Sequence, residues 1–264
     1  MKTHQSRIIL TFLLLLLISS FYAQKKVLLD NYFNNEVNKK TNLPFHYLWD
    51  DKAFSGFSEF GEVFKQNGAE IAILKEKPTQ LNLKNASVYI IVDPDNKFDA
   101  ENPNYMDKKA AKAIACWVKR GGVLLIMTND STNCDLEKIN ILTTKFGIKY
   151  NKDFNHPELR GEDKKIRNFP SCASVNLPSH PLFEGVSKIF IKEISSISIS
   201  KKAKAVLVEN NHVFMAEANY GKGYVFAVGD PWLYNEYIDH VLLPQDFENL
   251  KAAKNLVKML LSKN

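Results

Sequence analysis

The sequence contains few cysteines. Three occur in 264 residues, at Cys116, Cys134 and Cys172, and their spacing matches no metal-binding motif. At most one disulfide can form among them, so a hydrophobic core rather than cross-links must stabilise the fold. Hydrophobic residues make up 45% of the chain and charged residues 24%. This ordinary globular composition excludes collagen, a coiled coil and a disordered chain.

A strong excess of one charge is also missing. The 35 lysines and arginines outnumber the 29 acidic residues by six. No run of basic residues and no nucleic-acid-binding motif accompanies this surplus. We therefore expect no nucleic-acid partner, and the charge supports only a weak attraction to anionic ligands.

Long hydrophobic runs are confined to the N-terminus. Residues 1–24 have the pattern of a signal peptide: Lys2 and Arg7 precede an apolar run over 8–18, and Ala23 ends a plausible cleavage site. Its removal leaves a net charge of about +4, because two of the six surplus positive charges go with it. No other segment approaches the ~18 apolar residues of a membrane span. We expect an exported protein, periplasmic or secreted, with no stable span afterwards; an uncleaved anchor is the alternative.

Strand and helix patterns alternate in the first half of the chain. Short apolar runs indicate strands, and apolar residues at helical spacing indicate the helices between them. This alternation favours an α/β fold, with a parallel sheet and helices on both faces. The strands are expected at 27–30, 69–74, 88–92 and 123–127, and the helices at 55–67, 110–118 and 136–146.

The second half has more strand patterns and fewer helices. Residues 152–170 are polar and irregular, which indicates an excursion over the surface. Strands are expected at 189–191, 197–199, 205–208, 213–218 and 224–228, followed by an amphipathic helix over 247–260. Because no linker or repeat interrupts the pattern, we predict one α/β domain over 25–264.

Polar and aromatic residues follow each predicted strand. In an open parallel sheet, ligands bind beyond the carboxyl ends of the strands. Asn and Asp exchange hydrogen bonds with sugar hydroxyls, and Trp and Tyr stack on sugar rings, so the pattern favours a carbohydrate site. The alternative is that these residues form turns and that the tryptophans fill the core. The candidate binding residues are Asn31, Tyr32, Trp49, Asp50, Asp93, Asn104, Tyr105, Asn129, Asp130, Asp230, Trp232 and Asn235.

Two segments carry a first resemblance. Residues 180–186 (HPLFEGV) and 220–230 (YGKGYVFAVGD) resemble the class I glutamine-amidotransferase-like superfamily. That resemblance implies a mostly parallel central sheet flanked by helices. The amidotransferase nucleophile is a cysteine on a glycine-flanked turn. Residues 127–130 (MTND) stand in its place and Cys134 lies beyond them, so we expect no thiol amidase chemistry.

Four further segments carry a closer resemblance. Residues 45–51 (FHYLWDD), 92–95 (VDPD), 102–105 (NPNY) and 229–237 (GDPWLYNEY) resemble a Bacteroidetes domain found beside unsaturated rhamnogalacturonyl and glucuronyl hydrolases. The resemblance extends to ulvan oligosaccharide dehydratases. It implies an exported carbon–oxygen lyase of polysaccharide utilisation, which removes water from the non-reducing-end uronic acid of an acidic oligosaccharide. The 4,5-unsaturated product would pass to an unsaturated glucuronyl hydrolase.

Such an elimination needs three groups. A base must take the C5 proton, a donor must protonate the departing C4 hydroxyl, and a further group must neutralise the substrate carboxylate. His46 is the candidate base, because the ordinary pKa of histidine suits neutral pH. Tyr47, Tyr105 or Tyr234 could act as the acid, or as the base if its pKa were lowered. The candidates for holding the carboxylate are Asn31, Asn129, Asn235, Arg167 and Lys222.

This scheme requires no metal and no cofactor, and we predict neither. Asp93, Asp95, Asp130 and Asp230 could gather around a hard cation, but their spacing matches no cation-binding loop. Two other functions remain open. One is a non-catalytic carbohydrate-binding module, in which His46 is structural. The other is a hydrolase using paired carboxylates such as Asp50 and Asp230, which would have to lie ~5–9.5 Å apart.

Overall fold

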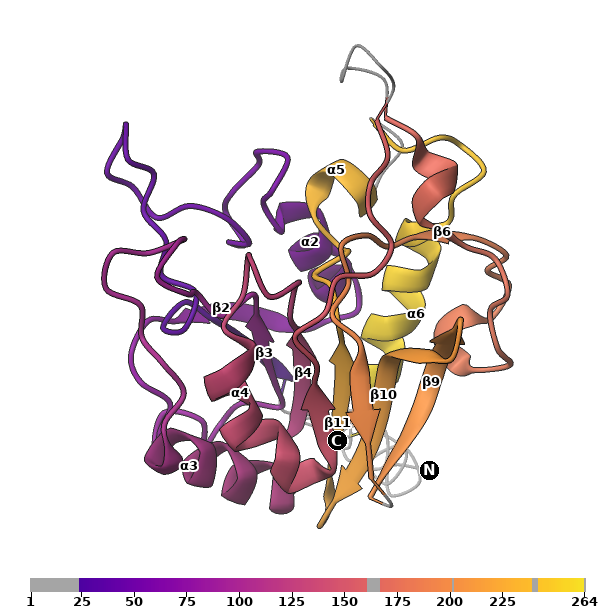
Figure 1. Cartoon of the computed structure of the whole chain (residues 1–264). Coiled ribbons are helices and arrows are strands. Elements are labelled where there is room, and N and C mark those ends of the chain that lie inside the picture. The colour runs from indigo at the N-terminus through magenta and orange to yellow at the C-terminus, as the bar shows by residue number, and fades with distance from the viewer. Residues whose placement is uncertain (1–23, 161–166, 201, 239–241, 264) are drawn as a thin grey trace, which may run out of the picture.

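The computed structural model describes residues 24–160, 167–200, 202–238 and 242–263. Its main sheet has the strand order β2-β1-β3-β4-β11-β10-β8-β5, with β9 paired to β10 (Figure 1). The first five strands in this order run parallel to one another. They are β2 (Glu70–Leu74), β1 (Lys26–Asp30), β3 (Val88–Val92), β4 (Val123–Met127) and β11 (Gly223–Val228).

Antiparallel strands extend the sheet on the β11 side. β10 (His212–Tyr220) pairs with β11 and with β9 (Ala203–Glu209), and β5 (Ile148–Tyr150) pairs with β8 (Ile197–Ile199). A separate two-stranded sheet joins β6 (Ala173–Ser174) to β7 (Ile189–Phe190). The expected mixed α/β fold with a large, mostly parallel sheet is therefore confirmed.

Helices cover both faces of this sheet. α2 (Ser58–Gln66), α5 (Asn235–Ile238) and α6 (Asn249–Ser262) pack on one face, with the alternate strand residues Val27, Ile90 and Leu125. α3 (Lys108–Lys119) and α4 (Leu136–Thr143) pack on the other face, against Leu28, Tyr89 and Leu124 (Figure 1). Because successive residues of a strand point to opposite faces, one apolar strand serves both cores.

Local sequence sets the ends of the helices. The Asp107 carboxylate accepts the Ala110 N–H at the start of α3, and the Asp135 carboxylate accepts two N–H groups at the start of α4. Gly68 and Gly147 have positive φ angles of 78° and 82° beyond α2 and α4, where residues other than glycine are strained. The α2 helix is shorter than the predicted 55–67.

The predicted signal peptide lies almost wholly outside the described residues, which begin at position 24. Within the described part of the chain, no helix is long and apolar enough to cross a membrane. The three cysteines are not in disulfides, and Cys134 and Cys172 are buried. Burial raises the pKa of the Cys134 thiol well above its usual range, so the sulfur stays protonated at neutral pH.

Candidate functional site

A cavity of ≈ 230 Å³ lies beyond the carboxyl ends of β1, β3, β4 and β11. β1 stands between β2 and β3, so the chain order reverses direction at β1. In open α/β sheets, ligands bind in the crevice outside such a switch point. The residues that line the cavity are Glu36, His46, Tyr47, Ser55, Asp93, Asp99, Asn129, Asn133, Lys192, Glu193, Tyr234 and Glu236.

His46 lines this cavity together with Glu36. The two side chains are 27% and 13% exposed, and Nδ1 of His46 is 2.8 Å from Oε2 of Glu36. When Nδ1 carries the proton that Glu36 accepts, Nε2 keeps its lone pair. The carboxylate also stabilises the imidazolium that forms when Nε2 takes a proton. His46 can therefore act as a general base, with Glu36 holding the ring in place.

Tyr47 and Asp93 form the second pair. The Tyr47 hydroxyl donates to Oδ2 of Asp93 at 2.7 Å, while Oδ1 of Asp93 is buried and has no hydrogen-bond partner. Burial raises the pKa of Asp93 well above its usual range, and the bond from Tyr47 offsets only part of this effect. Burial therefore favours the protonated form of the Asp93 carboxyl.

Tyr234 lies beside this pair. Its ring centroid is 5.5 Å from that of Tyr47, and its hydroxyl donates to Oδ1 of Asp230 at 3.1 Å. Burial raises the pKa of Asp230 to about 7. Burial and the neighbouring carboxylates raise the pKa of Tyr47 and of Tyr234 well above the usual value. Neither phenol fits the role of base, which would need a lowered pKa.

Lys192 is the only lysine or arginine among the described residues that line the cavity. Its amino group contacts the Glu193 carboxylate at 2.9 Å and lies 3.9 Å from that of Glu158, which is almost fully buried. Burial alone would lower the pKa of Lys192, but Glu193, Asp230 and Glu158 outweigh burial and raise it. The amino group of Lys192 therefore stays protonated and positively charged at the cavity wall.

The backbone at the cavity is strained. His46, Tyr47, Asp93 and Glu193 have positive φ angles of 64°, 50°, 42° and 51°. Such conformations cost about 1–3 kcal/mol each in residues other than glycine, and they cluster at functional sites. Backbone hydrogen bonds hold them in place, from Tyr47 N to Ser55 O at 2.9 Å and from Asp93 N to Met127 O at 2.8 Å. This concentration of strain favours a functional role.

Two carboxyl groups at the cavity pair with cations: Glu193 with Lys192, and Glu236 with Arg167 at 3.3 Å. Burial raises the pKa of Asp93 well above its usual range and that of Asp99 to about 6. The bond between Glu36 and His46 adds no compensating charge, because His46 must be uncharged to act as a base. The negative charge that an anionic ligand meets is therefore smaller than the number of acidic residues suggests.

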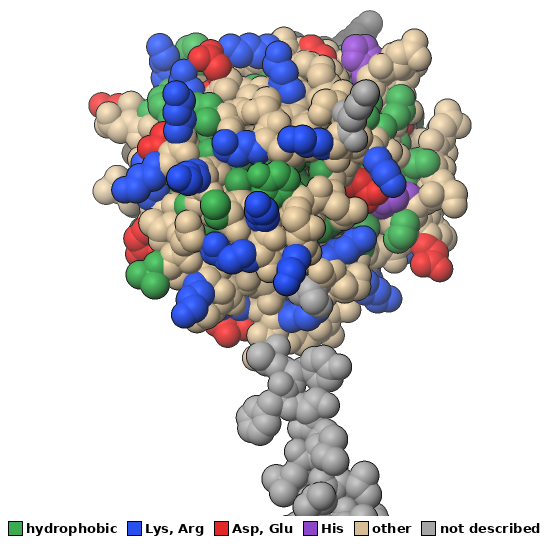
Figure 2. Space-filling view, turned by 90° about the horizontal axis from the view of Figure 1, so that it is seen from below, with side chains coloured by type: hydrophobic (Ala, Val, Ile, Leu, Met, Phe, Trp, Pro, Cys, Tyr) green, Lys and Arg blue, Asp and Glu red, His purple; other side chains and the backbone are tan. Residues whose placement is uncertain are grey.

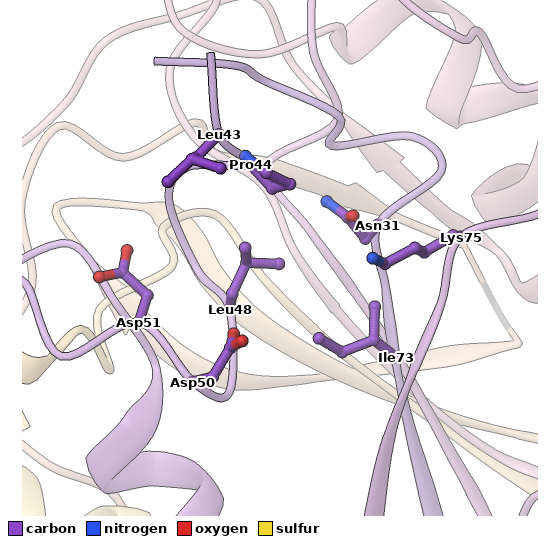
Figure 3. Close-up of a pocket in the computed structure, with 8 residues that line it drawn as sticks. All are labelled: Asn31, Leu43, Pro44, Leu48, Asp50, Asp51, Ile73 and Lys75. Carbon is purple, nitrogen blue, oxygen red and sulfur yellow. The ribbon is translucent and has the colours of Figure 1, made fainter. Parts of the chain in front are cut away.

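Two predicted residues line a different cavity. Asn31 and Asp50 border a space of ≈ 290 Å³ beside β1 and β2, with Leu48, Ile73 and Lys75 around it (Figure 3). The Asn31 amide donates to the backbone carbonyl of Asn34. Asp230 lines neither this space nor the first cavity, so Asp50 and Asp230 do not line a common cavity.

The predicted sugar-stacking tryptophans are buried. Trp232 has no exposed surface, and Trp49 is 8% exposed and packs against Phe57, Phe60 and Phe64. Neither ring face is open to a ligand, so both follow the core-filling alternative.

Asn235 also has a structural place. Its amide donates to the backbone carbonyls of Asp51 and Ala53, and its oxygen accepts the Glu59 N–H in the first turn of α2. It therefore joins the loop before α2 to the start of that helix, and does not reach the first cavity.

The remaining candidates lie in surrounding loops. The Asn104 amide donates to the carbonyl of Tyr32 at 3.0 Å, which joins two loops. Tyr105 is 38% exposed and lines another surface pocket. Asp130 is buried and accepts hydrogen bonds from Thr132 and Asn133, as in an ordinary polar turn. None of these residues lines the cavity that holds His46.

No group of three or more His, Cys, Asp or Glu side chains among the described residues is arranged to hold a metal ion. Asp99, Asn133, Lys192 and Glu193 also line the first cavity, and they were not predicted from the sequence. Lys192 and Glu193 follow the short strand β7, as two charged residues between Ile191 and Ile194. Only the left-handed backbone of Glu193 distinguishes this stretch, and sequence does not reveal it.

No known family model and no curated protein matches this sequence. Among solved structures, the chain is similar to the mmIFT52 N-terminal domain, at 18% identity and a TM-score of 0.63 over 91% of this chain and 98% of that one. It is also similar to the cytoplasmic protein STM3548 from Salmonella typhimurium, at 17% identity and a TM-score of 0.56 over 90% and 98%.

A third similar structure is a β-galactosidase from Rahnella, at 14% identity and a TM-score of 0.53 over 91% of this chain but 31% of that one. At such low identities these likenesses concern the fold alone.

Proposed function

We propose that the first cavity removes water from the non-reducing-end uronic acid of an acidic, ulvan-type oligosaccharide and leaves a 4,5-unsaturated uronyl end. One observation carries this proposal: His46 bonded to Glu36, a buried Asp93 whose pKa is raised, and Lys192 surround the same cavity. These groups supply the base, the acid and the cation that the elimination needs. The scaffold is proposed to be amidotransferase-like, without the cysteine nucleophile.

His46 takes the proton from C5 in this proposal. The electron pair of the broken C5–H bond forms the C4=C5 double bond, and Nε2 receives the proton. Glu36, 2.8 Å from Nδ1, holds the ring and stabilises its positive charge. Lys192 binds the substrate carboxylate, where negative charge builds as the C5 proton leaves.

Asp93 supplies the second proton. The C4–O bond breaks, its oxygen takes the proton from the Asp93 carboxyl, and one molecule of water leaves. The Tyr47 hydroxyl, bonded to Oδ2, stabilises the carboxylate that remains. We therefore assign the acid to Asp93 and a positioning role to Tyr47 and Tyr234, in place of the phenolic acid expected from sequence. Proton exchange with solvent restores His46 and Asp93.

The proposal extends to the protein's surroundings. The product is the substrate that an unsaturated glucuronyl hydrolase accepts, so such an enzyme would act next. An acidic oligosaccharide of this kind would be met in the periplasm or outside the cell, in accord with the predicted export.

The experiment incubates the protein with saturated, uronate-terminated oligosaccharides prepared from ulvan and from rhamnogalacturonan. Ultraviolet absorbance follows the conjugated double bond, and mass spectrometry follows the loss of one water. We expect both signals to rise together with one of the two substrates. If the protein binds oligosaccharide but neither signal appears, it is a non-catalytic carbohydrate-binding module. If it binds none, the carbohydrate assignment is wrong.

A further inference from the structure

Charged side chains are segregated between the two ends of the main sheet. The carboxyl ends of the parallel strands carry the cavity with its five acidic residues. At the amino ends, lysines and arginines are spread across a broad face (Figure 2). Acidic side chains are fewer there and lie mostly towards the edge of the face. The net charge of the sequence does not reveal this arrangement, because the negative charge at one end of the sheet partly cancels the positive charge at the other.

Four helices bring basic residues to this face. Lys65 is in the last turn of α2, Lys119 and Arg120 end α3, Lys145 follows α4, and Lys263 follows α6. All five are exposed. Positive charge at the C-terminal end of a helix stabilises the helix through the helix dipole. Helix stability alone therefore explains these five residues.

Helix stability does not explain the basic residues in the turns of the same face. Lys84 lies in the turn before β3, Lys202 and Lys204 lie at the start of β9, and Lys222 lies between β10 and β11. All four are exposed, and within the described part of the chain none is paired with a carboxylate. The Lys222 N–H donates to the Lys119 carbonyl at 3.0 Å, so this turn adjoins the end of α3. Positive charge is therefore found both at the helix ends and in the turns of this face.

We propose that this basic face binds a lipid bilayer that contains anionic phospholipids, so that the cavity at the opposite end of the sheet points away from the membrane. The basic side chains spread over the whole of this face and are not gathered in a single groove (Figure 2). No cavity described above is lined by these basic residues, as a site for a single polymer strand would be. Charge complementarity of this kind is strongest with anionic lipids.

The position of the chain start supports a membrane rather than a soluble polyanion. Lys25 lies at the start of β1, at the same end of the sheet, and its amino group donates to the Leu261 carbonyl near the end of α6. The sequence before Gln24 contains the apolar run over 8–18. In the uncleaved-anchor alternative, this apolar run joins the folded part at the basic face. This proposal does not depend on the proposed reaction.

The test uses the chain that begins at Gln24, because the two hydrophobic cores take their side chains from residues 27–261. Binding is measured by co-sedimentation with vesicles of equimolar phosphatidylglycerol and phosphatidylcholine, and with vesicles of phosphatidylcholine alone. The variant carries Lys119→Gln, Arg120→Gln and Lys222→Gln. The matched control carries Lys39→Gln, Lys40→Gln and Lys52→Gln, three exposed residues of the loop between β1 and α2.

We expect binding only to the vesicles with phosphatidylglycerol, and weaker binding as salt rises. Each cation near an anionic surface is worth about fivefold in affinity, so the three substitutions weaken binding about a hundredfold. The control stays within about twofold of the original chain. The proposal is overturned if the chain does not bind the anionic vesicles, or if variant and control lose affinity equally. It is also overturned if a soluble sulfated polysaccharide is bound through these residues while the vesicles are not.

Discussion

Tyr47 donates a hydrogen bond of 2.7 Å to one oxygen of Asp93, while the other oxygen of Asp93 is buried without a partner. Both residues have left-handed backbone conformations, so the fold holds them together against local strain. A buried carboxyl that keeps its proton and has one unsatisfied oxygen is suited to donate that proton to a ligand. This relationship links the fold to the proposed elimination.

Tyr47→Phe tests the relationship directly. The hydrogen bond from Tyr47 lowers the pKa of Asp93, so its loss raises that pKa further. Because activity needs protonated Asp93, the alkaline side of the kcat profile should move to higher pH, while kcat falls about tenfold or more. Tyr220→Phe, at the amino ends of the strands, is the control and should change neither. A profile that moves to lower pH would contradict the assignment of Asp93 as the acid.

The base is tested with two variants. His46→Ala should lower kcat by about 10²–10⁴-fold, because it removes the group that takes the C5 proton. Glu36→Gln keeps a hydrogen bond to Nδ1 but removes the charge, so its loss should be smaller. His212→Ala removes an exposed histidine and should leave the rate unchanged. Normal turnover by the His46→Ala variant would show that this histidine is structural.

Lys192→Met tests recognition of the substrate carboxylate. Loss of one charge-assisted contact of about 1.5–3 kcal/mol corresponds to an increase of about 10–100-fold in KM. A substrate whose terminal uronate is methyl-esterified carries no charge there, so the substitution should affect its KM much less. Lys112→Met, on the exposed side of α3, is the control. Equal effects on the acid and the ester would mean that Lys192 does not bind the carboxylate.

Trp49→Phe separates packing from sugar binding. The indole packs between α2 and the sheet, and its Nε1 donates to the Ala72 carbonyl at 3.2 Å. Truncation should cost about 1–3 kcal/mol of unfolding free energy, less than the ~3–5 kcal/mol of a full truncation to Ala. Urea unfolding measures this loss. The KM of the folded variant should remain unchanged, whereas a large rise in KM with normal stability would restore the stacking role.

The stability of the protein should fall as pH rises. Burial raises the pKa of Asp95 to about 8 and that of Asp230 to about 7. Between the ordinary carboxyl pKa and these values, the folded state binds protons that the unfolded state does not. The stabilisation is therefore complete below about pH 4 and is lost as pH rises towards 8.

Asp95→Asn is the matched variant for this pH dependence. An amide oxygen can still accept the Asn35 N–H that Asp95 accepts at 2.7 Å, without a charge to bury. Melting temperatures between pH 5 and pH 9, chosen to span the pKa of about 8, should fall less steeply for this variant than for the original chain. The substitution Asp50→Asn, at an exposed carboxylate, should leave the slope unchanged. Identical slopes for all three proteins would show that Asp95 titrates normally.

The sequence predicted the central sheet well, for physical reasons. β3 and β4 are runs of five apolar residues that are buried on both faces, and such runs are hard to mistake. Their polar followers, Asp93 and Asn129, were correctly placed at one end of the sheet. His46 and Tyr47 were predicted from the acid and base that the elimination needs, and both line the same cavity.

Other features were beyond sequence reasoning. Trp232 and Asp230 share one polar and aromatic segment, yet the indole is fully buried, and burial depends on contacts with α6 and β7 that no local pattern encodes. Lys192 reaches the cavity because the chain returns to the sheet after a long excursion. The basic face could not be predicted from the sequence, because its residues come from separate helix ends and turns and form no cluster along the chain.

The central claim is that the protein breaks the C5–H bond of a uronic acid and removes the C4 hydroxyl as water. The most direct measurement uses an oligosaccharide whose terminal uronate carries deuterium at C5, with mass spectrometry of the product. We expect a product that has lost both the deuterium and the C4 hydroxyl oxygen, and a rate that falls when C5 is deuterated. A product that keeps the deuterium, or an unchanged oligosaccharide bound to the protein, would contradict it.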